Sequence, residues 1–151
     1  IGLEDQRRMR ELRHAVPSAV YEYIAAHGVA KIGTDMAVPD GRLTELLAYY
    51  REELDRSGLK NLTWGHIGNN HLHANILADS PEQYLRGREL YDRFIDRALA
   101  LGGTVSAEHG IGKLKKKYLE RMFGVDGIAA MRAIRRTLDP AGILGSDTMF
   151  D

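Results

Sequence analysis

The feature that most restricts the fold of this 151-residue chain is a pair of strand-like segments joined by a very short linker. Residues 61–67 and 71–78 have the composition of β-strands, and Gly68, Asn69 and Asn70 separate them. The two asparagines suit the positive φ angles that a two-residue hairpin turn requires. The sequence therefore predicts an antiparallel hairpin near the middle of the chain.

The rest of the chain alternates between helical and strand-like patterns. Two further strands are expected at residues 31–38 and 104–107. Pro17 is expected to interrupt or restart the first helix, because proline disrupts a helix interior. Helical patterns cover residues 5–15, 20–26, 39–58, 81–101, 113–122 and 126–138. This order predicts a single α+β domain, in which helices pack on one face of a mainly antiparallel sheet.

Composition excludes several classes of protein. Basic and acidic residues are equal at 21 each, so no net charge attracts nucleic acid or an anionic membrane. The lysines of residues 113–117 lie beside acidic and basic neighbours, which favours a solvated helix face. The chain has no cysteine, which excludes disulfides and thiolate metal sites and fits a cytoplasmic location. No apolar run approaches the roughly 20 residues that a membrane-spanning helix needs.

Three histidines lie in the predicted hairpin. Strand alternation places His71, His73 and Asn75 on one face. With a two-residue turn, His66 lies opposite His73, with Cβ atoms about 4.5–5.5 Å apart. Two imidazoles at that separation can bind one metal ion. The same pattern also fits a polar, solvent-facing side of a sheet.

A second polar pair, Glu108 and His109, follows the predicted strand at residues 104–107. Glu108 can complete a site of two histidines and one carboxylate, which suits Zn²⁺ or a similar ion and leaves positions for a ligand. His109 is then available as a base, because histidine titrates near neutral pH. An exposed Glu-His pair at a glycine-rich helix start is the simpler interpretation.

Four segments, in the same order along the chain, resemble motifs of FAD-linked oxidases of the D-lactate, glycolate and D-2-hydroxyglutarate dehydrogenase type. The motifs are GHIGDGNLHxN at residues 65–75, SAEHGIG at 106–112, TDVAVP at 34–39 and LDPxGIL at 138–144. Because they span nearly the whole chain, the chain is identified as the C-terminal part of the substrate domain of this family. The resemblance implies a ferredoxin-like fold.

The resemblance also implies roles for individual residues. Residues matching His66, His73 and Glu108 hold a divalent metal, here expected to be Zn²⁺ or Mn²⁺, which binds the oxygens of a 2-hydroxy acid. The residue matching His109 takes the hydroxyl proton, and hydride passes from the α-carbon to FAD. Three residues are expected to contact the substrate: Arg13, Asn75 and Lys115.

The FAD-binding domain of the family is absent from the chain, which begins at Ile1 without an initiator methionine. We therefore expect a fragment that needs an FAD-binding domain or subunit as its partner. The chain alone should not oxidise D-lactate with an artificial electron acceptor. A cytochrome, a quinone or an electron-transfer flavoprotein all fit as the natural acceptor. The expected location is cytoplasmic, either free or peripheral to the inner membrane.

Departures from the family motifs keep two other functions open. Asn69, Asn70 and His71 replace the usual Asp-Gly-Asn, so that His71 becomes either a fourth metal ligand or a bulky neighbour. Residues 145–148 replace the usual NPGK, a segment near the flavin. One alternative is a metal-dependent hydrolase, which an ester and amide panel with added Zn²⁺ would reveal. The other is a non-catalytic remnant or docking module, which predicts no metal binding.

Overall fold

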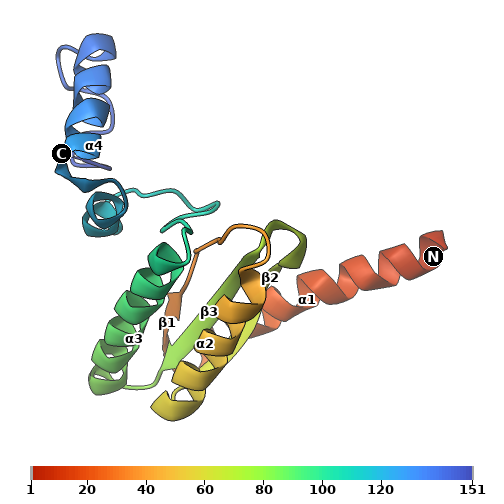
Figure 1. Cartoon of the computed structure of the whole chain (residues 1–151). Helices are drawn as coiled ribbons and strands as arrows, with labels where there is room; N and C mark the ends of the chain where they lie inside the picture. Colours follow the sequence, from red (N-terminus) through yellow and green to blue (C-terminus); the bar gives the residue numbers. More distant parts are fainter. Residues whose placement is uncertain (1, 151) are drawn as a thin grey trace.

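The computed structural model describes residues 2–150. Figure 1 shows the arrangement of its main elements, which comprise three strands and four α-helices in the described residues. In chain order they are α1 (Leu3–His27), β1 (Ala30–Gly33), α2 (Leu43–Ser57), β2 (Lys60–His66), β3 (His71–Ala78), α3 (Pro81–Ala100) and α4 (Lys116–Leu138).

The three strands form one sheet in the order β1-β3-β2, and β3 is antiparallel to both neighbours. β1 and β2 are therefore parallel to each other and connected through α2, which is the split βαβ arrangement of ferredoxin-like folds. α2 and α3 cover the same face of this sheet (Figure 1). The predicted α+β fold, a mainly antiparallel sheet with helices on one face, is confirmed.

The core lies between the sheet and the pair α2 and α3. Ala74 and Ile76 of β3 are completely buried against this layer, as are Tyr50 of α2 and Phe94 of α3. The rings of Tyr50 and Phe94 lie 4.4 Å apart between the two helices. Apolar residues at helical spacing therefore place α2 and α3 on the sheet, as expected of amphipathic helices.

The predicted two-residue turn of the hairpin is wrong. A 3₁₀ helix occupies Ile67–Asn69, and the register places His66 opposite His71 and Trp64 opposite His73. This register differs from the predicted one by two residues. Because side chains alternate with a period of two, the shift keeps all three histidines on one face.

A contact outside the hairpin accompanies the longer turn. Asn70 has a φ of 50° and donates its backbone N–H to the carbonyl of Ile67 at 3.2 Å. Its side-chain amide also donates to Asp40 Oδ1 at 2.6 Å. Asp40 precedes α2, so the loop is tied to another part of the chain. We attribute the longer turn to this contact.

Three other local predictions need correction. Pro17 lies inside a continuous α1, and Arg13, whose carbonyl would accept the missing N–H, is an exposed residue that water can reach. β1 ends at Gly33, and the predicted strand at 104–107 reduces to a single bridge between Thr104 and Ala37. The two predicted C-terminal helices form α4, but Gly124 breaks its helical geometry.

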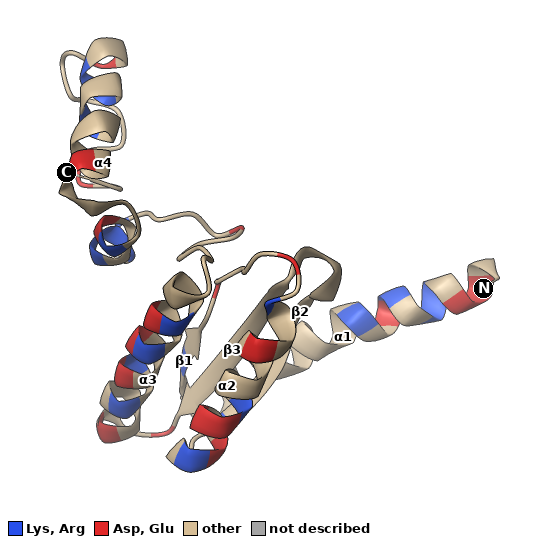
Figure 2. Cartoon of the chain, in the orientation of Figure 1, with Lys and Arg blue, Asp and Glu red and all other residues tan. Residues whose placement is uncertain are grey.

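Charged residues of both signs are interspersed along α1, α2 and α3 (Figure 2). Two ion pairs join α2 to α3: Arg93 with Glu53 at 2.8 Å, and Arg97 with Glu45 at 2.5 Å. Within the described residues, no helix is both long enough and apolar enough to cross a membrane.

Candidate metal centre and substrate pocket

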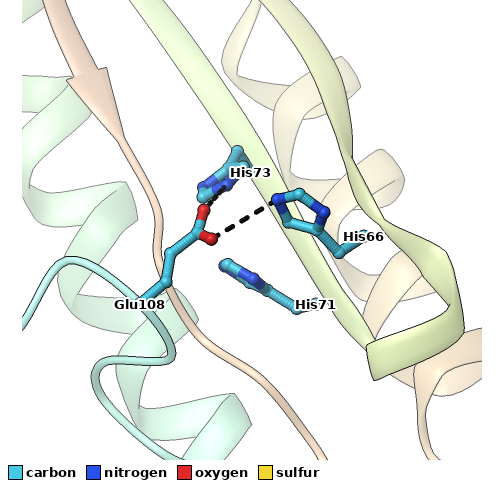
Figure 3. Close-up of side chains that lie close together, drawn as sticks. All are labelled: His66, His71, His73 and Glu108. Atoms are coloured by element: carbon cyan, nitrogen blue, oxygen red, sulfur yellow. Dashed lines mark hydrogen bonds and ion pairs between the residues drawn. The ribbon is translucent and has the colours of Figure 1, made fainter. Parts of the chain in front are cut away.

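The end of β2 and the start of β3 carry a cluster of possible metal ligands on the sheet face opposite α2 and α3. His66, His71, His73 and Glu108 point toward one another (Figure 3). One donor atom from each of these four residues lies within 4.8 Å of the others. β2 and β3 carry the three imidazoles, and the loop after α3 carries the Glu108 carboxylate.

Glu108 contacts two of the histidines directly. Its Oε1 lies 2.8 Å from Nε2 of His73, and its Oε2 lies 3.4 Å from Nε2 of His66. Desolvation alone would raise the pKa of Glu108, but the hydrogen bond from His73 and the nearby imidazoles lower it overall. Glu108 is therefore an anion at neutral pH, as a metal ligand must be.

A backbone carbonyl orients His73. Nδ1 of His73 donates a hydrogen bond to the carbonyl oxygen of Thr34 at 2.8 Å, which directs Nε2 toward Glu108. Thr34 is itself held by β3, because its hydroxyl donates to the carbonyl of Leu72 and accepts from the N–H of Ala74. Metal-binding histidines typically donate their second nitrogen to such a carbonyl.

His71 lies deeper than the other two histidines. Its side chain is only 4% exposed, and its ring centroid lies 4.3 Å from that of His73. Burial lowers the pKa of His71, and the adjacent His73 lowers it further. Nε2 of His71 lies 3.3 Å from Asp35 Oδ1 without forming a hydrogen bond, and it has no other partner.

Asp35 organises the loop that carries Glu108 and His109, a role that sequence reasoning missed. The Asp35 carboxylate is completely buried. Its Oδ2 accepts from Ser106 Oγ at 2.6 Å, Lys115 Nζ at 2.6 Å and the His109 N–H at 3.1 Å, and its Oδ1 accepts from the Glu108 N–H at 3.2 Å. One side chain thus fixes the backbone of both functional residues.

The electrostatics of Asp35 follow from these contacts. Burial alone would raise the pKa of the Asp35 carboxyl, but hydrogen bonds from Lys115, Ser106 and the Glu108 backbone hold it well below its usual value. The position of Asp35 within the TDVAVP-like segment, and of Lys115 after the SAEHGIG-like segment, was the only sequence signal for this pair.

A pocket of about 550 Å³ opens beside the cluster, and its lining includes Arg13, His66, His73, Asn75 and His109. Asn75 is buried and donates its amide to the carbonyl of His73 at 3.1 Å. The His109 side chain is 61% exposed, and its ring stacks on His73 with 5.1 Å between centroids. The structure thus brings six of the seven residues predicted for the site, these five and Glu108, to the wall of one pocket.

Lys115, the remaining predicted substrate contact, does not line this pocket. Its ammonium group lies 2.6 Å from Asp35 Oδ2 and 3.0 Å from Ser106 Oγ, and the side chain is mostly buried. These contacts make Lys115 part of the support beneath the site.

The clustered residues fit a divalent cation. Three imidazoles and one carboxylate form a donor set that suits Zn²⁺ and related ions. The Thr34 carbonyl that orients His73, and Nε2 of His71, which has no hydrogen-bond partner, add to this fit. A second group, in which Asp35 and His109 replace His66 and His71, is less suitable because Lys115 already neutralises Asp35.

Comparison with known proteins gives a consistent result. The family model described as FAD linked oxidases, C-terminal domain, matches residues 3–148. The chain is 37% identical to the mitochondrial D-lactate dehydrogenase (cytochrome) of Arabidopsis thaliana, over 81% of the chain and 22% of the relative. It is 30% identical to glycolate oxidase subunit GlcD of Bacillus subtilis, over 77% of the chain and 25% of the relative.

A third relative is the D-2-hydroxyglutarate dehydrogenase of Xanthomonas citri, which is 36% identical over 60% of the chain and 20% of the relative. The chain thus spans only about a fifth to a quarter of the length of these relatives. The family match covers nearly every residue that the structure describes. The chain therefore belongs to the family of C-terminal domains of FAD-linked oxidases.

Proposed function

We propose that this chain is the substrate- and metal-binding part of an FAD-dependent dehydrogenase that oxidises a small 2-hydroxy acid to the corresponding keto acid. The observation that carries this proposal is the convergence of His66, His73 and Glu108 beside a pocket that also contains Arg13 and His109. The names of two of these relatives support D-lactate or glycolate as the type of substrate.

Two groups outside the chain would supply the remaining chemistry. When bound, the divalent metal polarises the substrate oxygens and lowers the pKa of the hydroxyl, and FAD on another domain or subunit accepts the hydride. His66, His73 and Glu108 hold the metal in this proposal. We propose a cytoplasmic location, free or peripheral to the inner membrane, in keeping with the absence of cysteine.

The residues around the pocket divide the remaining tasks. His109 is accessible and lies beside the ligands, with Nε2 3.6 Å from Glu108 Oε1, so it can take the proton from the substrate hydroxyl. Arg13 can pair with the substrate carboxylate, because its planar guanidinium matches two oxygens. Asn75, which is buried, lines the pocket with its amide group. Lys115 supports the site through Asp35 instead of touching the substrate.

The purified chain should bind one divalent ion. After chelation and reloading with Zn²⁺, Mn²⁺ or Fe²⁺, elemental analysis is expected to find about one tightly held ion per chain. The His66→Ala/His73→Ala double variant should lose it, because two of the three ligands that we assign are removed. His27→Ala is the control, since His27 is exposed at the end of α1.

Calorimetry of D-lactate and glycolate binding, to the metal-loaded and to the metal-free chain, extends this test to the substrate. Acetate, which lacks the hydroxyl, is the comparison ligand. Metal binding that is unchanged in the double variant would contradict the proposed site. Hydrolysis of esters or amides by the Zn²⁺-loaded chain would instead support the hydrolase alternative. A chain that folds but holds no metal would favour the docking module.

A further inference from the structure

We propose that His71 is a fourth protein ligand of this metal site, which makes the donor set three imidazoles and one carboxylate and selects Zn²⁺ over Mn²⁺. This inference rests on the proposed function, because it specifies the cofactor of the same site. It depends on observations that concern His71 alone, so it can fail while the rest of the site stands.

The sheet register places His71 where a ligand is needed. His71 lies directly opposite His66 and two residues before His73, so all three side chains leave the same face of the sheet. Its ring centroid is 5.6 Å from that of His66 and 4.3 Å from that of His73. Figure 3 shows the His71 ring pointing toward Glu108, as the other two rings do.

The burial of His71 gives independent evidence. The residue is only 3% exposed, yet Nε2 has no hydrogen-bond partner. Buried polar atoms in native proteins nearly always have a partner, and an orphan calls for an explanation such as an ion at the site. The other unpartnered buried side-chain atom in the described residues is Nε of Arg97, which lies away from the cluster between α2 and α3.

Asp35 does not satisfy His71. Although its Oδ1 lies 3.3 Å from Nε2 of His71, the two atoms form no hydrogen bond. The Asp35 carboxylate already accepts from Ser106, Lys115 and two backbone N–H groups. A metal held by His71, His73 and Glu108 would bind the His71 imidazole and leave the hydrogen bonds of the Asp35 carboxylate in place.

The extra imidazole has a consequence for metal choice. Nitrogen donors suit Zn²⁺, whereas Mn²⁺ prefers carboxylate, carbonyl and water oxygens. A fourth protein ligand would also hold Zn²⁺ more tightly than three, and a substrate oxygen would then bind as the fifth ligand that Zn²⁺ can accept. We therefore expect the chain to discriminate more strongly between the two metals than a variant with asparagine at position 71.

The test compares Zn²⁺ and Mn²⁺ affinities of His71→Asn, His73→Asn and His27→Asn with those of the original chain, by competition with a chromophoric chelator. Circular dichroism and thermal unfolding establish that each variant is folded. We expect His71→Asn to weaken Zn²⁺ binding by roughly tenfold or more, the scale seen even for residues that only support a ligand. Mn²⁺ binding should fall less, and His27→Asn should change neither.

A second measurement does not depend on any variant. X-ray absorption of the Zn²⁺-loaded original chain should show scattering from three imidazoles instead of two. Loss of Zn²⁺ binding in His73→Asn with normal affinity in His71→Asn, or two imidazoles in the absorption spectrum, would overturn this inference and leave the proposed function intact. Failure of the original chain to bind Zn²⁺ while it binds Mn²⁺ would overturn this inference alone, and failure to bind any of Zn²⁺, Mn²⁺ and Fe²⁺ would overturn both.

Discussion

Replacement of Asp35 by asparagine is expected to lower the free energy of unfolding by about 3–5 kcal/mol, the usual cost of removing one partner from a buried ion pair. Asp35 is completely buried, and Lys115 Nζ lies 2.6 Å from its carboxylate. The variant leaves the lysine charge without its partner. It also places an amide N–H₂ group where one of the two backbone N–H groups, of Glu108 and His109, needs an acceptor.

Urea unfolding followed by circular dichroism measures this effect. Asp96→Asn is the matched control, because Asp96 makes an exposed ion pair with Arg121 at 3.1 Å and should cost less than about 1 kcal/mol. The Asp35→Asn/Lys115→Met double variant should recover part of the loss, since it removes both charges together. Equal stability of the two single variants would show that Asp35 does not hold the loop.

The same contacts predict how acid affects the protein. The pKa of Asp35 in the folded chain is lower than in the unfolded chain, mainly because the hydrogen bonds from Lys115 and Ser106 outweigh the opposing effect of burial. The carboxylate therefore contributes its full stabilisation above the unfolded pKa, about 4, and loses it as the pH falls toward the folded value. Asp35→Asn should lack this part of the acid transition.

Truncation of Phe94 to alanine should have a comparable effect on stability, a loss of about 3–5 kcal/mol. Phe94 is completely buried between α2 and α3. Its ring centroid lies 4.4 Å from that of Tyr50 and 6.1 Å from that of Tyr49. The cavity would lie in the helix layer, on the opposite face of the sheet from the histidines. The folded variant should therefore keep the metal affinity of the original chain.

Thermal and urea unfolding of Phe94→Ala, beside a titration with Zn²⁺, separate these two properties. Leu85→Ala on the same helix is the control, since Leu85 is 64% exposed and its truncation should change stability little. A large drop in metal affinity of folded Phe94→Ala would show that the two faces of the sheet are coupled, contrary to our expectation.

Local patterns predicted much of the fold. The helical patterns at residues 39–58 and 81–101 were sufficient to locate α2 and α3. The Ser80 hydroxyl caps α3 by accepting the N–H of Gln83 at 3.2 Å. The turn was predicted wrongly. The longer loop is accompanied by a contact of Asn70 with Asp40, which lies 30 positions away. No local pattern carries such a distant contact.

In the site, too, local patterns were predicted correctly and distant contacts were missed. The alternation of His71 and His73 placed them correctly on one face even though the register was shifted by two residues. Asp35 was missed because its partner Lys115 lies 80 positions away and the pair forms only when the chain folds. Sequence reasoning assigned Lys115 to the substrate, whereas the structure gives it a partner inside the protein.

One strand, β3, serves both faces of the sheet, and this limits how the protein can change by insertion or deletion. Its eight residues are all buried, with Ala74 and Ile76 packed in the core and His73 and Asn75 beside the pocket. A one-residue insertion within the strand would exchange the two sets, with imidazoles in the apolar layer and aliphatic groups at the site. We expect descendants of this sequence to vary here by substitution alone, with length changes confined to the loops.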